Sequence, residues 1–339
     1  MPAAIMLSLI TLASLLLGVA SASNSSACPV RISQKLHERS AYADTHRFQA
    51  IWSTVAADLK ASFSGCNNQA RSAIRFAFHD AAGYSSKTPV YAPASGGADG
   101  SLLLSAEEIS RPIENPLQIF KPWLLAKYNQ YQAEGVGAAD LVQFAGNIAI
   151  RVCPGGPVVQ TLVGREDSFT PAANGTLPEG FGPGSDYDSL TSLFADKGFS
   201  TTDLAALVGA HTCSRAFAQR QIPFGGSQDS TPTQWDTKYY QQLRSAHAKR
   251  NVDDTNVGGG GGGTGGAGSR DRGPQGVYHF ASDINLSNPN TTVGQEMARF
   301  ATSLDAFNSA FVDAMGRMNL LGIPASVASG FVDCTHLVE

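Results

Sequence analysis

The chain has 339 residues, of which 42% are hydrophobic, so it can bury a sizeable core in one large domain or in two closely packed halves. Its formal net charge is -4, with 24 Lys and Arg against 28 Asp and Glu, and no long run of like charges occurs. This balance excludes the clustered cations that phosphate contacts require, so we expect no nucleic-acid partner.

The N-terminal segment is almost uninterrupted apolar sequence from Ile5 to Val19, followed by the small residues Ala20-Ser21-Ala22. This pattern is typical of a cleaved leader, so we expect residues 1–22 to be a signal peptide. Residues 23–339 would then be the secreted mature domain, with no membrane contact. A membrane anchor is the alternative, because no Lys or Arg precedes the apolar run.

Two further features agree with a secretory route. Asn-x-Ser/Thr tripeptides give four candidate glycosylation sites, at Asn24, Asn174, Asn285 and Asn290. The five cysteines lack the paired spacing of a zinc site and would mostly form disulfides in an oxidising compartment, leaving one over. They are Cys28, Cys66, Cys153, Cys213 and Cys334.

Apolar residues spaced three and four apart indicate amphipathic helices along most of the chain. The expected helices cover residues 46–63, 70–79, 138–150, 187–197, 202–209 and 297–321. Thr201 to Asp203 and Gly137 to Asp140 supply capping residues and acidic first turns. Alternation of period two is scarce, so the fold class is mostly α.

Three segments interrupt the helices. Residues 84–100 and 168–184 are rich in Pro and Gly and are long enough to line the mouth of a cavity. Residues 258–268 form a glycine-rich run that cannot bury apolar surface, and we expect a flexible surface loop within one domain.

Two histidine motifs carry the chemistry. Arg75 and His79 are four residues apart, so on a helix both side chains project from one face. His211 ends an apolar run and has small neighbours, which permit the close approach of a flat ligand. Taken singly, each histidine is explained as well by a place in the core.

The Arg-x-x-x-His-Asp motif, the later Gly-Ala-His-Thr motif and the Gly-Gly-Ala-Asp-Gly-Ser segment at 96–101 together resemble the plant and fungal haem peroxidase superfamily. The resemblance is closest to its secreted fungal members and runs from about Cys66 to Cys334, with the motifs in the family's order. It implies two helical halves that sandwich one haem b, with hydrogen peroxide as a substrate.

By this resemblance His211 would ligate the haem iron, and Asp283 would accept the other N–H of its ring. A turn or capping role is the alternative for Asp283. His79 would act on peroxide as a base and then as an acid, while Arg75 stabilises the charge on the departing oxygen.

The resemblance assigns three more residues to the peroxide side. Phe78 would cover the distal face of the haem, where intracellular relatives carry tryptophan. Asn115 would accept a hydrogen bond from the far nitrogen of His79, and Glu108 would support this network. Between Glu108 and Asn115 the chain is one residue longer than the family pattern.

Two calcium sites are also implied, because their matching positions offer the oxygen donors that hard cations select. The distal site would comprise Asp80, Gly97, Asp99 and Ser101. The proximal site would comprise Thr212, Asp229, Thr231, Gln234 and Asp236. Ordinary Asp/Gly turns are the alternative.

The cysteines match the family in part. Cys66 and Cys153 match a disulfide of the fungal enzymes. Cys334 matches another family cysteine, but its usual partner is missing, and either Cys213 or Cys28 is left to replace it.

The expected reductant follows from two differences between this chain and the family. At the positions of the manganese ligands of some fungal members this chain has Asn68, Ser72 and, after His211, Phe217. At the position of the surface tryptophan of ligninolytic members it has Ala206. We therefore expect a monomeric, generic peroxidase that oxidises phenols and similar small reductants at the haem edge. The tryptophans are expected to pack in the core; they are Trp52, Trp123 and Trp235.

Three other functions compete with this hypothesis. An intracellular peroxidase or a catalase-peroxidase is disfavoured by Phe78 and by the leader. A calcium-binding wall protein that has lost haem is disfavoured by the intact histidine motifs. A zinc hydrolase built from His79, Asp80 and His211 lacks the required ligand spacing.

Overall fold

The computed structural model describes residues 41–87, 96–218, 221–256 and 276–339. The expected signal peptide, Asn24, Cys28 and the glycine-rich run 258–268 lie outside these residues. Within the described ranges, no helix combines the length and apolar character needed to cross a membrane.

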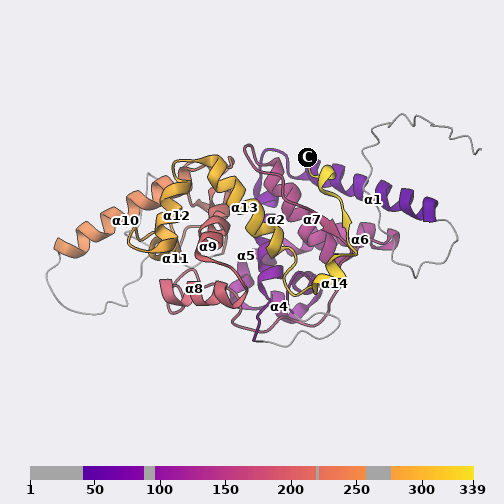
Figure 1. Ribbon diagram of the computed structural model, residues 1–339, viewed down its shortest axis with the longest axis horizontal. Coiled ribbons are helices and arrows are strands. Elements are labelled where there is room, and N and C mark those ends of the chain that lie inside the picture. The colour runs from indigo at the N-terminus through magenta and orange to yellow at the C-terminus, as the bar shows by residue number, and fades with distance from the viewer. Residues whose placement is uncertain (1–40, 88–95, 219–220, 257–275) are drawn as a thin grey trace, which may run out of the picture.

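Helices dominate the described chain, which confirms the mostly α fold class. Figure 1 shows the helices of the first half on one side of the molecule and α8 to α12 on the other, with α13 between them. The first half contains α1 (Ala41–Ser62), α2 (Asn68–Ala82), α3 (Ser101–Leu104), α4 (Ala106–Ile109), the 3-10 turn η1 (Pro112–Glu114), α5 (Asn115–Gln118), α6 (Lys121–Tyr131), η2 (Gln132–Glu134) and α7 (Ala138–Val152). The second half contains α8 (Tyr187–Asp196), α9 (Thr201–Val208), η3 (Gly209–Cys213), α10 (Lys238–Asn256), α11 (Ala281–Leu286), α12 (Thr292–Phe300), α13 (Leu304–Met318), α14 (Ala325–Ala328) and η4 (Thr335–Leu337).

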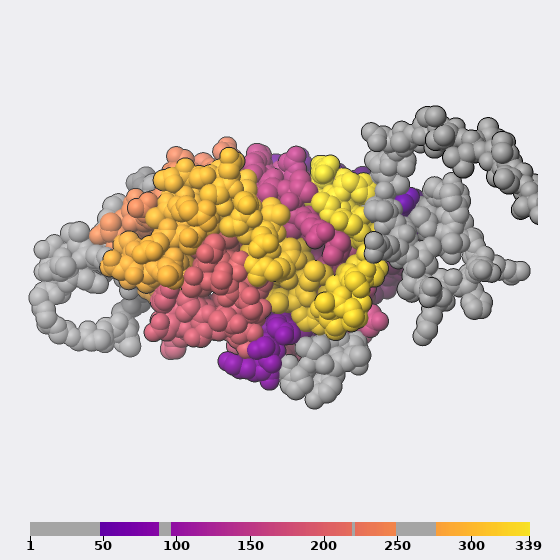
Figure 2. Space-filling view, in the orientation of Figure 1, coloured from indigo at the N-terminus to yellow at the C-terminus, as the bar shows by residue number. Residues whose placement is uncertain are grey.

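Two short antiparallel ribbons complete the described elements. Strand β1 (Leu162–Val163) pairs with β4 (Val332–Asp333), and β2 (Arg215–Ala216) pairs with β3 (Gly226–Ser227). The first ribbon returns the C-terminal segment to the first half. Figure 2 shows residues from α12 to the C-terminus covering much of the visible face.

One predicted helix is wrong in its extent. The single helix expected over 297–321 is two helices, α12 and α13, separated at 301–303. The hydroxyl of Ser303 accepts a hydrogen bond from the Ala306 backbone N–H at 3.1 Å, so it starts a new helix with its own N-cap. Apolar periodicity continues across the break and therefore hides it.

Helices α2 and α7 pack closely enough to fix the position of the Arg75 and His79 motif on α2. A Cβ atom built on Gly146 of α7 would lie 2.5 Å from the Cβ of Ala77, so only glycine permits this approach. The Cys66–Cys153 disulfide joins the start of α2 to the end of α7, which confirms the predicted pair. The close contact with α7 and the disulfide both hold α2 against the core.

The N-terminus of α7 is capped from a distance. Gly137 offers no side chain, and the carboxylate of Asp167 accepts hydrogen bonds from the backbone N–H groups of Ala138 at 2.9 Å and Ala139 at 2.8 Å. Asp140 does lie in the first turn, but its carboxylate pairs with the buried Arg165 guanidinium at 2.8 Å. The sequence therefore located this helix start and missed its cap.

The remaining cysteines answer one open question. Cys334 is disulfide-bonded, whereas Cys213 is a free, buried thiol, so Cys213 is not the partner of Cys334. The sulfur of Cys213 nevertheless lies within 4.8 Å of the sulfurs of Cys66 and Cys153.

The tryptophans pack largely as expected. Trp52 and Trp235 are buried, and the Trp235 ring lies parallel to that of Phe307 with centroids 5.3 Å apart. Trp123 is half-buried and stacks on Phe120 with centroids 5.2 Å apart. The prediction of a core position holds fully for two of the three.

Candidate functional site

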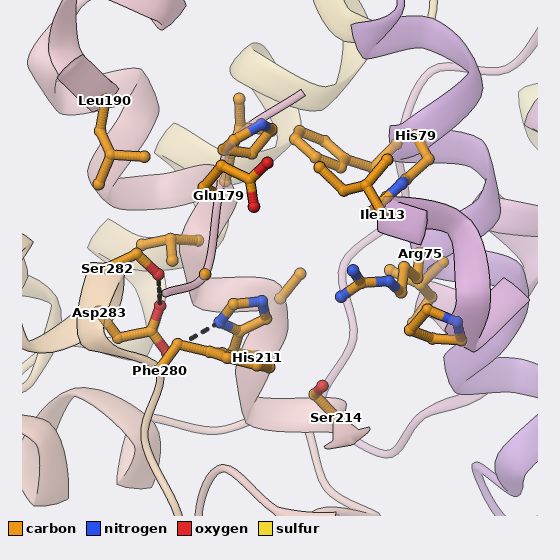
Figure 3. Close-up of a pocket in the computed structure, with 18 of the residues that line it drawn as sticks. Arg75, His79, Ile113, Glu179, Leu190, His211, Ser214, Phe280, Ser282 and Asp283 are labelled. Carbon is orange, nitrogen blue, oxygen red and sulfur yellow. Dashed lines mark hydrogen bonds and ion pairs between the residues drawn. The ribbon is translucent and has the colours of Figure 1, made fainter. Parts of the chain in front are cut away.

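A cavity of about 490 Å³ separates α2 from the face built by α9, η3 and α11. Its volume is within the usual range for a site that buries a small organic ligand. Arg75 and His79 project into it from one side, and His211 from the facing side (Figure 3). Its apolar lining includes Phe78, Leu190, Phe194, Leu204, Leu207, Val208, Phe280, Phe311 and Met315.

His211 lies in η3, the turn that follows α9. A Cβ atom on Gly209 would lie 2.1 Å from the hydroxyl oxygen of Tyr240, so glycine is required for η3 to approach the core. The Tyr240 hydroxyl donates a hydrogen bond to the carbonyl of Ala205 at 2.8 Å, which secures α9 just before the turn. The histidine is thus held by a tightly packed scaffold.

Among the described residues, only Nδ1 of the His211 ring has a hydrogen-bond partner. Its Nδ1 lies 3.1 Å from Oδ2 of Asp283, whose side chain is fully buried. Because an ionised carboxylate only accepts hydrogen bonds, Nδ1 carries the proton and Nε2 is left with a lone pair toward the cavity. This is the arrangement of a metal-ligating imidazole.

On the opposite side, α2 brings Arg75, Phe78 and His79 to the same cavity, as the four-residue spacing predicts. The Nε atom of Arg75 is buried and has no hydrogen-bond partner among the described residues. The Phe78 ring lies nearly parallel to that of Phe194, with centroids 6.3 Å apart. The Nε atom of this buried cation therefore has no hydrogen-bond partner in the described chain, beside a cavity with many apolar lining residues.

His79 is suited to act as a base. Burial lowers the pKa of its imidazole, the attraction of Glu114 opposes this shift, and the Arg75 cation adds to it. The net direction is downward, so the ring favours its neutral form, which can take a proton.

The predicted partner of His79 requires a correction. Nδ1 of His79 lies 2.9 Å from Oε2 of Glu114, whereas Asn115 is exposed and its Oδ1 accepts a hydrogen bond from Gln118 at 3.2 Å. Consecutive side chains of a helical turn point in different directions, so only one of the two adjacent residues can face the histidine. With Glu114 as the partner of His79, the spacing from Glu108 also equals that of the family, so the chain no longer has an extra residue in this segment.

Glu108 does not reach His79. Its Oε2 accepts a hydrogen bond from the backbone N–H of Ala172 at 3.0 Å, and burial raises its pKa to about 7. Its carboxylate lies near those of Asp80 and Asp99. Its predicted support of His79 stays a prediction.

The distal oxygen set gathers around the end of α2. Burial, followed by the repulsion of Asp99 and Glu108, raises the pKa of Asp80 well above its usual value. Oδ2 of Asp99 and Oγ of Ser101 are buried with no hydrogen-bond partner in the described chain. Gly97 has φ 121°, a conformation that only glycine adopts easily. Buried, mutually repelling carboxylates beside orphan oxygens fit a divalent cation.

The proximal oxygen set adjoins His211 in the same way. The Thr212 hydroxyl lies 2.9 Å from Oδ2 of Asp229, 3.4 Å from the Gln234 carbonyl oxygen and 3.3 Å from Oδ1 of Asp236. Thr231 donates its hydroxyl to Oδ2 of Asp236 at 2.9 Å. Burial raises the pKa of Asp229 to about 7. All five predicted members therefore meet in one cluster of oxygen atoms.

The positions that would bind manganese in some fungal relatives carry other contacts. Oδ1 of Asn68 accepts a hydrogen bond from Arg71 at 2.7 Å, and the Arg71 side chain lines the cavity. Phe217 packs edge-on against Phe224 with centroids 5.2 Å apart. Ala206, at the position of the ligninolytic tryptophan, is fully buried.

The candidate glycosylation sites differ in accessibility. Asn174 and Asn290 are exposed. Asn285 is half-buried, and its side-chain amide donates to the Ser185 carbonyl at 2.9 Å. A glycan on Asn285 would have to displace this hydrogen bond.

Comparisons with known proteins agree with this geometry. The family described as peroxidase matches residues 55–303. Manganese peroxidase 3 of Phlebia radiata is 30% identical over 284 residues, which cover 81% of this chain and 71% of the relative. Manganese peroxidase H4 of Phanerodontia chrysosporium is 27% identical over 84% of this chain and 72% of its own length. A peroxidase of Arthromyces ramosus is 32% identical over 195 residues, or 56% of this chain and 52% of its own length.

Proposed function

The chain belongs to the peroxidase family, and from this premise we propose that it is a secreted haem peroxidase that reduces hydrogen peroxide and oxidises phenols or similar small reductants at the haem edge. One observation carries the proposal. Two histidines from separate elements face one cavity, and a buried carboxylate holds Nδ1 of each ring. Because the Nε2 atoms point inward, one is available to a metal and the other to a substrate proton.

The residues present fit haem b. Nε2 of His211 would ligate the haem iron, Asp283 would fix the tautomer of the ring, and the apolar lining with Phe78 and Phe280 would match the faces of a flat macrocycle. Haem b, when bound, supplies the iron centre that exchanges electrons with peroxide and with the reductant.

Proton transfer and charge stabilisation are carried out by side chains of the protein itself. Nε2 of His79 would take a proton from the bound peroxide and return it to the departing oxygen. Arg75, with its unpartnered Nε, stabilises the negative charge that develops on that oxygen. Phe78 and Phe194 supply apolar surface to the same cavity.

The two oxygen clusters support calcium as a second cofactor. Asp80, Gly97, Asp99 and Ser101 would hold one ion, and the cluster around Thr212 would hold the other. Each cluster includes the residue that follows a site histidine, so bound calcium would stabilise both faces of the cavity. Glu108 belongs with the first cluster by position.

The proposed reductant class rests on the surroundings of the cavity. Asn68, Ser72 and Phe217 offer no carboxylate for Mn(II), and the nearby Arg71 cation repels it.

We propose the protein to be a monomer that binds no nucleic acid and contacts no membrane after its leader is removed.

The spectrum of the haem-loaded protein tests this function. We expect a Soret band that shifts when hydrogen peroxide is added and returns when a phenol is supplied. Simple phenols should be turned over, and Mn(II) should not. A featureless near-ultraviolet spectrum after haem reconstitution would refute the proposal, and efficient Mn(II) turnover without phenol turnover would refute the assigned reductant class.

Removal of calcium should destabilise the protein and disturb the haem environment. A chelator is expected to lower the melting temperature and to alter the Soret band, because buried carboxylates lose the cation that neutralises them. Asp229→Ala should lower the melting temperature without added chelator, and added calcium should restore less of it than in the unmodified protein. The matched control is Asp188→Ala, an exposed aspartate outside both clusters. Identical melting curves with and without chelator would contradict the calcium sites.

A further inference from the structure

The distal histidine is held by a carboxylate where the family resemblance led us to expect an amide. Glu114 and His79 are both buried, with side chains 1% and 4% exposed, and their contact of 2.9 Å is a normal hydrogen-bond length. We infer that Glu114 is the positioning residue of His79: its carboxylate accepts the hydrogen bond from Nδ1 and so aims Nε2 at the peroxide site. This inference rests on the proposed function of the cavity.

The local structure keeps Glu114 in place. Glu114 ends the 3-10 turn η1, its backbone N–H donates to the Arg111 carbonyl at 2.9 Å, and Pro112 restricts the start of the turn. Pro116 and Leu117, which follow it in α5, are both buried. A short turn fixed at both ends presents its carboxylate to the histidine at little entropic cost.

Charge explains why a carboxylate is tolerated in this buried position. The Arg75 guanidinium shares the site and remains charged, so it needs a counter-charge. Burial lowers the pKa of Arg75, and the attraction of Glu114 opposes this shift more than that of Asp283. Glu114 therefore compensates the cation while its oxygen orients the imidazole.

The hydrogen bond decides which tautomer His79 adopts. An ionised carboxylate has no proton to donate, so Nδ1 must carry the hydrogen and Nε2 must be the acceptor. If residue 114 could not accept a hydrogen bond, both tautomers of His79 would become accessible, and its ring could rotate away from the cavity. The same logic applies to Asp283 and His211 on the other side.

A pair of conservative substitutions separates the hydrogen bond from the charge. Glu114→Gln keeps the reach and an acceptor oxygen but removes the charge, whereas Glu114→Asp keeps the charge and shortens the reach. We expect the rate of the peroxide-induced Soret change in Glu114→Gln to stay within about 10-fold of the unmodified protein, and Glu114→Asp to lose about 100-fold. Glu114→Leu should lose at least as much as Glu114→Asp.

The affinity of the ferric protein for cyanide gives a second readout that involves no turnover. Hydrogen cyanide must lose its proton to Nε2 of His79 before the anion binds, so affinity should fall in the same order as the rate. Glu107→Gln, which alters an exposed carboxylate on α4, is the matched control and should stay within about twofold of the unmodified protein, because Glu107 does not contact His79. Asn115→Ala, at the residue that the family pattern selects, should lose less than Glu114→Asp.

Several results would overturn the inference. These are a Glu114→Asp variant that equals or exceeds Glu114→Gln, an Asn115→Ala variant as slow as Glu114→Asp, or unchanged cyanide affinity in all Glu114 variants. The failure of the unmodified protein to respond to peroxide would instead overturn the proposed function, and the inference with it. The Gln and Asp variants decide the question even if Glu114→Leu does not fold.

Discussion

His211→Ala is expected to abolish stable haem binding. On this face of the cavity, His211 is the only described imidazole whose ring is oriented by a buried carboxylate. Its other ring nitrogen is therefore available to bind the iron. Alanine removes the donor and leaves Oδ2 of the buried Asp283 without the hydrogen bond from His211, which adds a desolvation cost, while Oδ1 keeps the hydrogen bond from Ser282. After haem reconstitution and gel filtration, the variant should show little or no Soret absorbance.

Two further measurements make this result specific. Added imidazole should restore part of the Soret band, because it can occupy the space left by the side chain. Asp283→Asn should retain haem more weakly, by roughly 10- to 100-fold in affinity, because loss of a partner behind a ligand typically costs that much. His336→Ala, at the half-buried C-terminal turn, is the control. Haem retention by His211→Ala equal to that of the control would mean that another residue ligates the iron.

His79→Ala is expected to leave haem bound while slowing the reaction with peroxide by about 100- to 10,000-fold, the usual contribution of a general acid–base group. Arg75→Ala should slow the same step by about 100- to 1,000-fold, because it removes the charge that stabilises the departing oxygen. Both effects arise from side chains that face the cavity opposite His211. Stopped-flow measurement of the Soret change against peroxide concentration gives the rate constant directly.

The comparison needs a cation that lies outside the cavity. Arg299→Ala removes a half-exposed guanidinium on α12 that pairs with Glu296, and it should not change the rate. The Soret position of each variant before peroxide is added checks that the haem site is intact. If either His79→Ala or Arg75→Ala reacted as fast as Arg299→Ala, the role assigned to that residue would be wrong.

The part of the site that local geometry determines was predictable from the sequence. Arg75 and His79 share a helix face because they are one helical turn apart, and no distant contact is needed to bring them together. The pairing of His211 with Asp283, 72 residues later, has no such local cause. It was expected only because the motifs resemble a known family.

Glu114 shows where that approach fails. Two adjacent polar residues compete for one place, and their directions depend on how η1 and α5 are rotated against the core. The family pattern predicted Asn115 as the partner of His79, because asparagine is the residue type of the family. The spacing from Glu108 already favoured its neighbour, Glu114. The cap of α7 escaped notice for a related reason, because Asp167 lies 29 residues from the N–H group of Ala138 that it satisfies.

The three sulfur atoms at the junction of α2, α7 and η3 make the covalent structure depend on the order of folding. A chain in which Cys213 is still accessible can exchange it for Cys66 or Cys153, since a thiolate attacks any disulfide within reach. Once the core closes, burial raises the pKa of the Cys213 thiol, and the attacking species is almost absent. The Cys66–Cys153 pairing of the folded chain is therefore protected from exchange with the thiol beside it.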